Sequence, residues 1–253
     1  MKSKAVLFIV MVAMLLVFVP GESRGADGQL ALGKTVYQRR CAFCHGLDGD
    51  GKGLAEFVIK KKKGRVWKVY PRDFTATTFR LRTTPTGSLP TDEDLMRVIT
   101  TGIPRSSMPT AKDLSPEEKK AVITYIKSFS KRWKAETAEA PVVTTKPASF
   151  GTPESIAKGE LLWKNMKCWE CHGTKGVGDG PKSDTIVDDT KKPILPFDFT
   201  VGALKRGTMP EDIYFTFTTG LDGTGMPSYA DSMSEEDRWH LVSYTSKLMG
   251  MTK

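Results

Sequence analysis

Two short stretches of the chain combine thiol and imidazole side chains at the same spacing. Together they contain all four cysteines and two of the three histidines: Cys41, Cys44, His45, Cys168, Cys171 and His172. Residues i, i+3 and i+4 share one face of a helix, so a single helical turn would present two thiols and an imidazole side by side. A Cys-x-x-Cys pair on its own also suits a zinc site or dithiol exchange. Each stretch is therefore a candidate site for metal, redox or cofactor chemistry.

The histidine directly after the second cysteine favours one of these chemistries. Cys-x-x-Cys-His is the attachment pattern of a c-type haem. The two thiols can form thioethers with the vinyl groups of the porphyrin, and the histidine can reach over the ring to the iron. A structural zinc site needs four ligands, whereas each copy offers two cysteines and only one or two histidines. The sequence therefore predicts two covalently attached haem c groups, with His45 and His172 as iron ligands.

Two methionines are candidates for the remaining iron position. Met108 and Met226 are each followed by proline and preceded by a Gly-containing loop. A loop residue held rigid by proline can bring a thioether to the far side of a haem. Most methionines only fill core space, and Met209 and Met96 are interpreted in that way. The predicted axial ligands are His45, Met108, His172 and Met226, a His/Met set that favours the reduced iron and a high potential.

The two copies of the motif belong to a longer internal repeat. Residues 71–75 (Pro-Arg-Asp-Phe-Thr) recur as residues 196–200 (Pro-Phe-Asp-Phe-Thr). A Thr-Thr-Gly at 100–102 recurs at 218–220, each time ahead of a Met-Pro pair. The spacing between matching residues drifts along the chain, as insertions and deletions in the loops of duplicated domains would produce. The sequence therefore predicts two domains of the same kind.

The chain begins with a segment that predicts export. Residues 5–19 are apolar and uncharged, follow two lysines and precede small residues, which is typical of a secretory signal peptide cleaved after Gly25. The run is shorter than the ~20 residues of a membrane span, and an uncleaved membrane anchor is the alternative. We expect a periplasmic protein. The predicted organisation is a signal peptide at 1–25, a first domain at 26–134, a semi-extended, proline-containing linker at 135–149 and a second domain at 150–253.

Helical patterns surround both motifs. Ser115, Pro116 and Glu118 form an N-terminal capping signature, followed by an apolar stripe at helical spacing, and the second copy starts its counterpart at Ser234. Residues 35–40 predict a helix before the first motif, and a shorter helix leads into each Thr-Thr-Gly. No segment alternates convincingly between apolar and polar residues as a strand would. The predicted fold class is all-α, with two helical domains.

The positive charge is unevenly distributed. The net charge is +9, and the excess lies in residues 26–140, which favours a localised basic surface over general affinity for nucleic acid. The densest run contains Lys60, Lys61, Lys62, Lys63 and Arg65. It predicts a docking site for an acidic redox protein; a solvated loop and contact with anionic lipid headgroups are the alternatives. The counterpart near residues 184–189 is acidic, so the two domains are not expected to dock on the same partner surface.

Each half resembles a class I cytochrome c domain. The resemblance rests on Cys-x-x-Cys-His-Gly near the start, a Met-Pro loop and an aromatic-bearing C-terminal helix, and it covers residues 30–130 and 155–250. The tandem arrangement is similar to periplasmic dihaem cytochromes c of the cytochrome c4-like type. This resemblance implies electron transfer between larger redox enzymes, with both irons six-coordinate. The insert at 60–82 departs from a minimal cytochrome c.

Three functions are compatible with these residues: a mobile electron carrier, a dedicated subunit of a respiratory or dehydrogenase complex, and a haem enzyme such as a peroxidase. The third needs an open or labile axial position, so the two complete ligand sets favour an electron-transfer protein over an enzyme.

Some residues suggest minor roles. Arg80, Arg82, Lys205 and Arg206 could pair with haem propionates, and His240 is expected to be an exposed helix residue.

Overall fold

A computed structural model describes residues 25–55, 57–62 and 65–252. Residues 1–24 of the predicted signal peptide lie outside these ranges. The structure also does not describe Lys63 or the side chains of Lys60, Lys61, Lys62 and Arg65. The docking site predicted for this run therefore stays a prediction. In the described residues, no helix combines the length and the apolar character needed to cross a membrane.

The first half of the chain is a group of helices around one apolar core. The helices are α1 (Ala26–Arg40), α2 (Ala42–His45), α3 (Asp92–Thr101), α4 (Pro116–Ser128) and α5 (Arg132–Ala135). Ser115 caps α4 in a capping box with Glu118, and Pro116 occupies the first helical position, as the sequence predicts. Val36 and Tyr37 of α1 pack with Val122 of α4 in the buried core.

The second half repeats this arrangement with its own core. Its helices are α6 (Pro153–Asn165), α7 (Trp169–His172), the 3-10 helix η1 (Phe199–Val201), α8 (Pro210–Thr219) and α9 (Glu235–Leu248). Ser234 caps α9 by accepting a hydrogen bond from the Asp237 N–H. Trp163, Ile213 and Leu241 are among the buried residues of this core. The all-α fold class is confirmed for both halves.

A glycine allows the N-terminal and C-terminal helices of each half to cross at close range. A Cβ atom on Gly33 of α1 would lie 2.1 Å from the carbonyl oxygen of Ala121 in α4. A Cβ on Gly159 of α6 would lie 2.0 Å from the carbonyl oxygen of His240 in α9. Only a residue without a Cβ permits these contacts. The helix that precedes each Cys-x-x-Cys-His stretch is thereby held against the C-terminal helix of its half.

The insert of the first half adds a feature that the sequence analysis missed. Strands β1 (Phe57–Lys62) and β2 (Arg65–Val69) pair antiparallel, with Phe57 opposite Val69 and Ile59 opposite Trp67. The β-branched and aromatic residues that favour strands are interrupted here by a lysine run, which hides the alternation. The matching loop of the second half contains only an isolated bridge, Val187 to Pro193.

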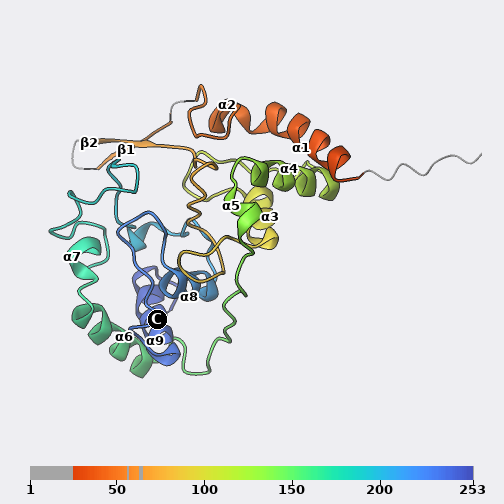
Figure 1. The fold of residues 1–253 in the computed structure, drawn as a ribbon. Helices are drawn as coiled ribbons and strands as arrows, with labels where there is room; N and C mark the ends of the chain where they lie inside the picture. Colours follow the sequence, from red (N-terminus) through yellow and green to blue (C-terminus); the bar gives the residue numbers. More distant parts are fainter. Residues whose placement is uncertain (1–24, 56, 63–64, 253) are drawn as a thin grey trace, which may run out of the picture.

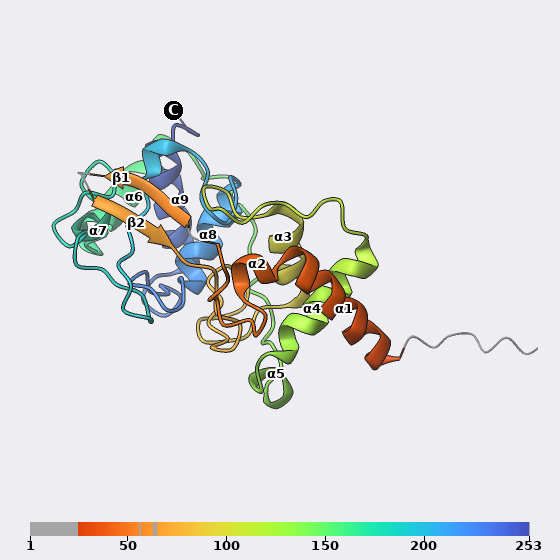
Figure 2. The same cartoon turned by 90° about the horizontal axis from the view of Figure 1, so that it is seen from above.

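The two halves lie side by side. Figures 1 and 2 show the first half (red to green) next to the second half (teal to blue), and the β1–β2 hairpin extends from the first half over the second. Next to the hairpin, Lys192 Nζ lies 3.6 Å from the centre of the Tyr70 ring. The extended segment between α5 and α6 touches both halves, because the Val142 N–H donates to Thr83 O and Trp239 Nε1 donates to Thr144 Oγ1. The exact domain boundaries stay a prediction.

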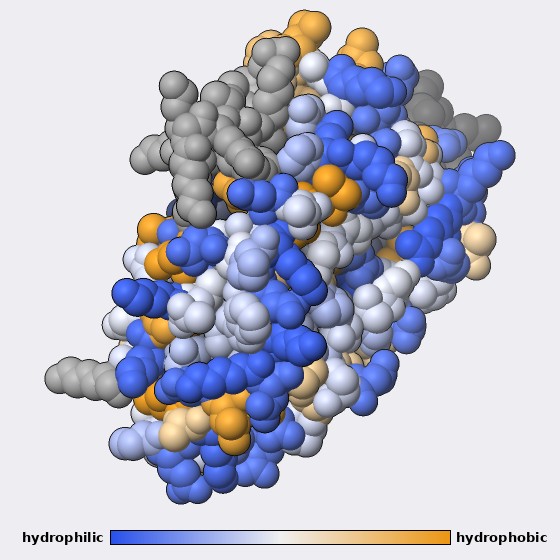
Figure 3. Space-filling model, turned by 90° about the vertical axis from the view of Figure 1, so that its left-hand side faces the viewer, coloured by the Kyte–Doolittle hydropathy of each residue, from blue (hydrophilic) through white to orange (hydrophobic). Residues whose placement is uncertain are grey.

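The surface on the hairpin side is mostly hydrophilic. Figure 3 shows charged and polar residues over most of this face, with apolar residues in small separate groups. His240 is one of the polar residues that the fold buries. His240 is only 4% exposed, and its Nδ1 lies 2.8 Å from Ser155 Oγ between α6 and α9. The expectation that His240 is exposed is therefore wrong, because the close crossing at Gly159 buries this face of α9.

Candidate functional site

Each Cys-x-x-Cys-His stretch folds into a single helical turn. The His45 N–H donates to Cys41 O at 2.9 Å, and the His172 N–H donates to Cys168 O at 2.9 Å. This i to i+4 bond places the first cysteine and the histidine on one face of the turn, with the second cysteine beside them. All four cysteines are free. The side chains required for covalent haem attachment are thus brought together in both halves.

A backbone carbonyl holds each histidine ring. His45 Nδ1 lies 3.1 Å from Arg72 O, and His172 Nδ1 lies 2.9 Å from Phe197 O. A carbonyl oxygen can only accept, so Nδ1 carries the proton and the lone pair of Nε2 is left for a metal. Burial lowers the pKa of both imidazoles below the usual value. Both rings are therefore neutral at neutral pH, the protonation state in which an imidazole can bind a metal.

The residue directly before each repeated Asp-Phe-Thr segment supplies these carbonyls. Asp73 Oδ1 accepts hydrogen bonds from the N–H and the hydroxyl of Thr75 at 2.8 and 2.6 Å. Asp198 Oδ1 does the same for Thr200 at 2.9 and 2.6 Å. Such an Asx turn fixes the backbone around the aspartate, and the carbonyl directly before it faces the histidine. The repeat is visible in the sequence, but the sequence does not show that it positions the carbonyl that contacts the histidine.

The thiols are protonated rather than reactive. Burial raises the pKa of Cys41 to about 11 and that of Cys168 to about 11, and it also raises the pKa of Cys44 and Cys171. Reactive and zinc-binding cysteines have lowered thiol pKa values, because the thiolate is the nucleophile and the ligand. These surroundings disfavour dithiol exchange and suit thiols that are consumed in covalent attachment.

The two methionine loops have the same backbone structure. In the first half, the Ile103 N–H donates to Met108 O at 3.2 Å, and the Met108 N–H donates to Ser106 Oγ at 3.1 Å. In the second half, the Leu221 N–H donates to Met226 O at 3.0 Å. There the Met226 N–H donates to Thr224 Oγ1 at 3.1 Å. Both methionines are half-buried, and each loop holds the backbone of its methionine through the same set of hydrogen bonds.

A glycine at the start of each loop permits this fold. Gly102 has φ +67°, and its Cβ would lie 2.8 Å from Met108 O. Gly220 has φ +65°, and its Cβ would lie 2.6 Å from the Ser228 nitrogen. Both backbones combine a left-handed conformation with a close approach, which only glycine tolerates. The Thr-Thr-Gly repeat seen in the sequence therefore marks the base of the methionine loop.

Aromatic rings surround each histidine, and one of them carries an unsatisfied polar atom. The ring of Phe74 stacks on His45 with centroids 4.5 Å apart, and Phe199 lies 5.1 Å from His172. Trp163 is 2% exposed and packs 5.7 Å from His172, yet its Nε1 has no acceptor among the described residues. A buried N–H needs an acceptor, and a carboxylate-bearing group bound beside His172 would supply one. The cysteines and the histidine of the stretch fit a haem, and so does the unpaired Nε1–H of Trp163.

Several arginines of the first half make ion pairs or hydrogen bonds with the second half. Arg80 pairs with Asp188 at 3.1 Å, and Arg72 lies 3.9 Å from Asp189. The acidic segment of the second half is thus directed at the first half. Arg82 also contacts the second half, and its pairing with a propionate stays a prediction, as do those of Arg80, Lys205 and Arg206. The sequence suggested arginines near a haem but held no signal for this interface.

Comparison with known proteins adds independent findings. The family model described as "Cytochrome C oxidase, cbb3-type, subunit III" matches residues 28–126 and 154–244. Among solved structures, a chain of the "Kuenenia stuttgartiensis reducing HAO-like protein complex Kustc0457/Kustc0458" is 40% identical, with a TM-score of 0.79. The match covers 86% of the present chain and 95% of the other. No curated protein matches the chain.

Proposed function

This chain belongs to the cytochrome c family described as cytochrome C oxidase, cbb3-type, subunit III, and on that premise we propose that it is a periplasmic electron carrier with two His/Met-ligated haems. Its two tandem cytochrome c domains make it an electron-transfer protein with covalently bound haem c. When bound, each haem supplies an iron that takes up and gives up a single electron. Cys41 and Cys44 would attach one haem, and Cys168 and Cys171 the other.

The observation that carries the proposal is the equivalence of the two sites. In each half a neutral histidine is held through Nδ1 by a carbonyl, and a methionine loop is closed by the same hydrogen bonds. Such a hydrogen bond to the ring nitrogen that does not face the metal orients a histidine ligand and raises its basicity. The protein would therefore fill both axial positions of each iron, His45 with Met108 and His172 with Met226, and would stabilise the reduced state.

Substitution of the methionines tests the ligand assignment. We expect Met108→Ala and Met226→Ala each to remove about half of the methionine-to-iron charge-transfer band of the oxidised protein and to lower the potential of one haem, because a Met/His set raises the potential. Met209→Ala is the matched control. Met209 also precedes a proline, but the expectation that it fills core space is wrong, because it lies directly before α8 with 60% of its surface exposed. Its loss should change neither quantity. Unchanged spectra in both ligand variants would contradict the assignment.

A second candidate function is a permanent subunit of a redox complex. The relative of known structure is part of a complex named for two proteins, and the family itself is described as an oxidase subunit. Stoichiometric co-purification with a redox enzyme would favour this role, whereas a free monomer in the periplasmic fraction would favour the mobile carrier. Rapid binding of carbon monoxide to one reduced haem would instead indicate an open axial position and an enzyme.

The partner of a mobile carrier is proposed to be an acidic redox protein that docks near Lys60, Lys61, Lys62, Lys63 and Arg65. Support comes from the concentration of positive charge in the first half, because charge complementarity mainly accelerates encounter. The rate of electron exchange with such a protein should fall as salt is added. A rate independent of ionic strength would contradict this docking mode.

A further inference from the structure

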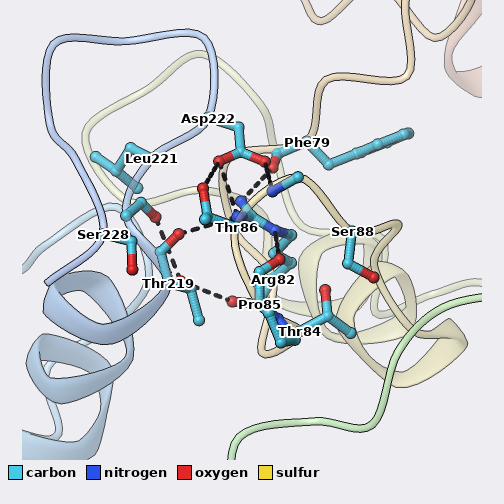
Figure 4. A network of polar contacts seen from close by, with 12 residues as sticks. Phe79, Arg82, Thr84, Pro85, Thr86, Ser88, Thr219, Leu221, Asp222 and Ser228 are labelled. Atoms are coloured by element: carbon cyan, nitrogen blue, oxygen red, sulfur yellow. Dashed lines mark hydrogen bonds and ion pairs between the residues drawn. The ribbon is translucent and has the colours of Figure 1, made fainter. Parts of the chain in front are cut away.

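One of the differences between the two methionine loops places a carboxylate against the other half of the molecule. The loops match residue by residue, so Pro104 of the first loop corresponds to Asp222 of the second. Proline offers no side-chain acceptor, whereas the Asp222 carboxylate extends out of its loop toward the first half (Figure 4). The equivalence of the two sites ends at this residue.

Three groups of the first half bind the Asp222 carboxylate. Arg82 Nη2 donates to Oδ1 at 2.8 Å, Thr86 Oγ1 donates to Oδ1 at 2.8 Å, and the Gly87 N–H donates to Oδ2 at 2.9 Å. We call Asp222 with these three residues the Asp222 clamp. Next to it, Arg80 Nη2 donates to Gly223 O at 3.4 Å. Two consecutive residues of the Met226 loop are therefore bound by the other half.

Arg82 is itself immobilised. Its side chain is 0% exposed, and its Nε and Nη1 donate to Pro85 O and Phe79 O at 3.1 and 3.0 Å. Its Nη2 also donates to Thr219 O at 2.9 Å, directly before the glycine at the base of the Met226 loop. Charge-assisted bonds in a buried site are strong and directional. Arg82 therefore holds both the base and the side of this loop.

Within the part of the chain that the structure describes, the first loop has no carboxylate bound in this way. Its Arg105 instead makes a cross-half contact in which the guanidinium lies 5.1 Å from the centre of the Phe197 ring. A partly exposed cation–π contact is worth about 0.5–1 kcal/mol, and Arg105 is exposed at its loop. The other half of the molecule therefore holds the Met226 loop much more firmly than it holds the Met108 loop.

We propose that the Asp222 clamp makes methionine ligation in the second half depend on the first half. Asp222 and Arg82 are positioning residues that act through the Met226 loop. The proposal rests on the His/Met ligation proposed above. A thioether is a weak, neutral ligand, so the loop that carries it must be held in place. Loss of the clamp would free the loop and lower the occupancy of Met226 as a ligand, whereas Met108 would be unaffected.

The test isolates one methionine at a time. In a Met108→Ala background only Met226 contributes to the charge-transfer band of the oxidised protein. Adding Asp222→Ala should weaken that band. It should also lower the imidazole concentration that displaces Met226 from the iron by about tenfold or more, which is the usual cost of losing a residue that positions a metal ligand. Asp222→Asn, which keeps the shape but loses the charge, should give a smaller change in the same direction. Far-UV circular dichroism checks that each variant is folded.

Two controls separate the clamp from general damage to the interface. Lys192→Ala removes another contact between the halves, the cation–π contact of Lys192 with Tyr70, which involves neither methionine loop, and it should leave the imidazole titration of Met226 unchanged. In a Met226→Ala background, Asp222→Ala should leave the titration of Met108 unchanged. An equal effect of Lys192→Ala, or no effect of Asp222→Ala on Met226, would overturn the clamp. If the Met108→Ala parent itself keeps the full band, the ligand assignment fails instead.

Discussion

At the scale of single residues, a backbone carbonyl fixes the tautomer of each histidine that is predicted to bind iron. The oxygens of Arg72 and Phe197 fix the tautomer of His45 and His172, and the following aspartates hold those carbonyls through Asx turns. The Asp-Phe-Thr repeat therefore acts twice. Its aspartate orients the acceptor of the histidine, and its phenylalanine, Phe74 or Phe199, packs against the histidine ring.

This arrangement predicts that Asp73→Ala and Asp198→Ala each affect one haem. Loss of the Asx turn should weaken the carbonyl bond to the nearby histidine, reduce the basicity of the ring and raise the potential of that haem alone. The lost hydrogen bonds should also lower the free energy of unfolding by about 1 kcal/mol. A redox titration that resolves both haems measures the potentials. If neither potential moves, the turns do not support the histidines.

At the scale of secondary-structure elements, each site depends on one helix crossing. Gly33 lets α1 lie against α4, and Gly159 lets α6 lie against α9. The Cys-x-x-Cys-His turn follows directly after α1 and α6, and the Met loop follows α3 and α8. The distance between each histidine and the methionine of the same half is thus set by helix packing rather than by local sequence.

The close helix crossing in each half predicts that one added methyl group lowers the free energy of unfolding. Gly159→Ala places a Cβ 2.0 Å from the His240 carbonyl oxygen, and relief of such overpacking costs about 1–3 kcal/mol, although alanine has the higher helix propensity. Denaturant unfolding should show the loss, and Gly33→Ala should show the same effect in the first half. Lys158→Ala, at an exposed position of the same helix, is the control and should be close to wild type.

At the scale of the whole molecule, an interface of charged groups joins the halves. Arg80 and Arg72 meet Asp188 and Asp189, and the fully buried Arg82 meets Asp222. Arg206 adds a hydrogen bond from its Nη2 to Arg82 O. Such bonds are directional, so they specify one relative placement of the halves, and they connect the support of one candidate haem site to the other half.

This interface predicts that Arg82→Ala uncouples the halves. Removal of one partner of a buried ion pair costs about 3–5 kcal/mol, and the variant removes the hydrogen bonds that Arg82 donates to Asp222, Thr219 and Phe79. We expect thermal unfolding in two separated steps where wild type shows one. Arg39→Ala removes an exposed ion pair with Glu118 and should change little. A single unshifted transition in Arg82→Ala would contradict the coupling.

Much of this protein follows from its sequence because the relevant signals are local. The Cys-x-x-Cys-His turn, the capped C-terminal helices and the Met-Pro loops each depend on neighbouring residues, and the internal repeat shows that they form two similar domains. The all-α class and the cytochrome c resemblance are confirmed. The haem ligands stay predictions that the geometry of both sites supports.

The tertiary structure alone decided what depends on residues far apart in the chain. The burial of His240, the carbonyl behind each histidine and the β1–β2 pairing arise from packing between separate segments. The same holds for Arg82, whose partners lie in both halves. A sequence pattern records which residues suit a helix or a turn, but a charged side chain carries no sign of its distant partner. Only the folded chain therefore shows that the second methionine loop is held by the first domain.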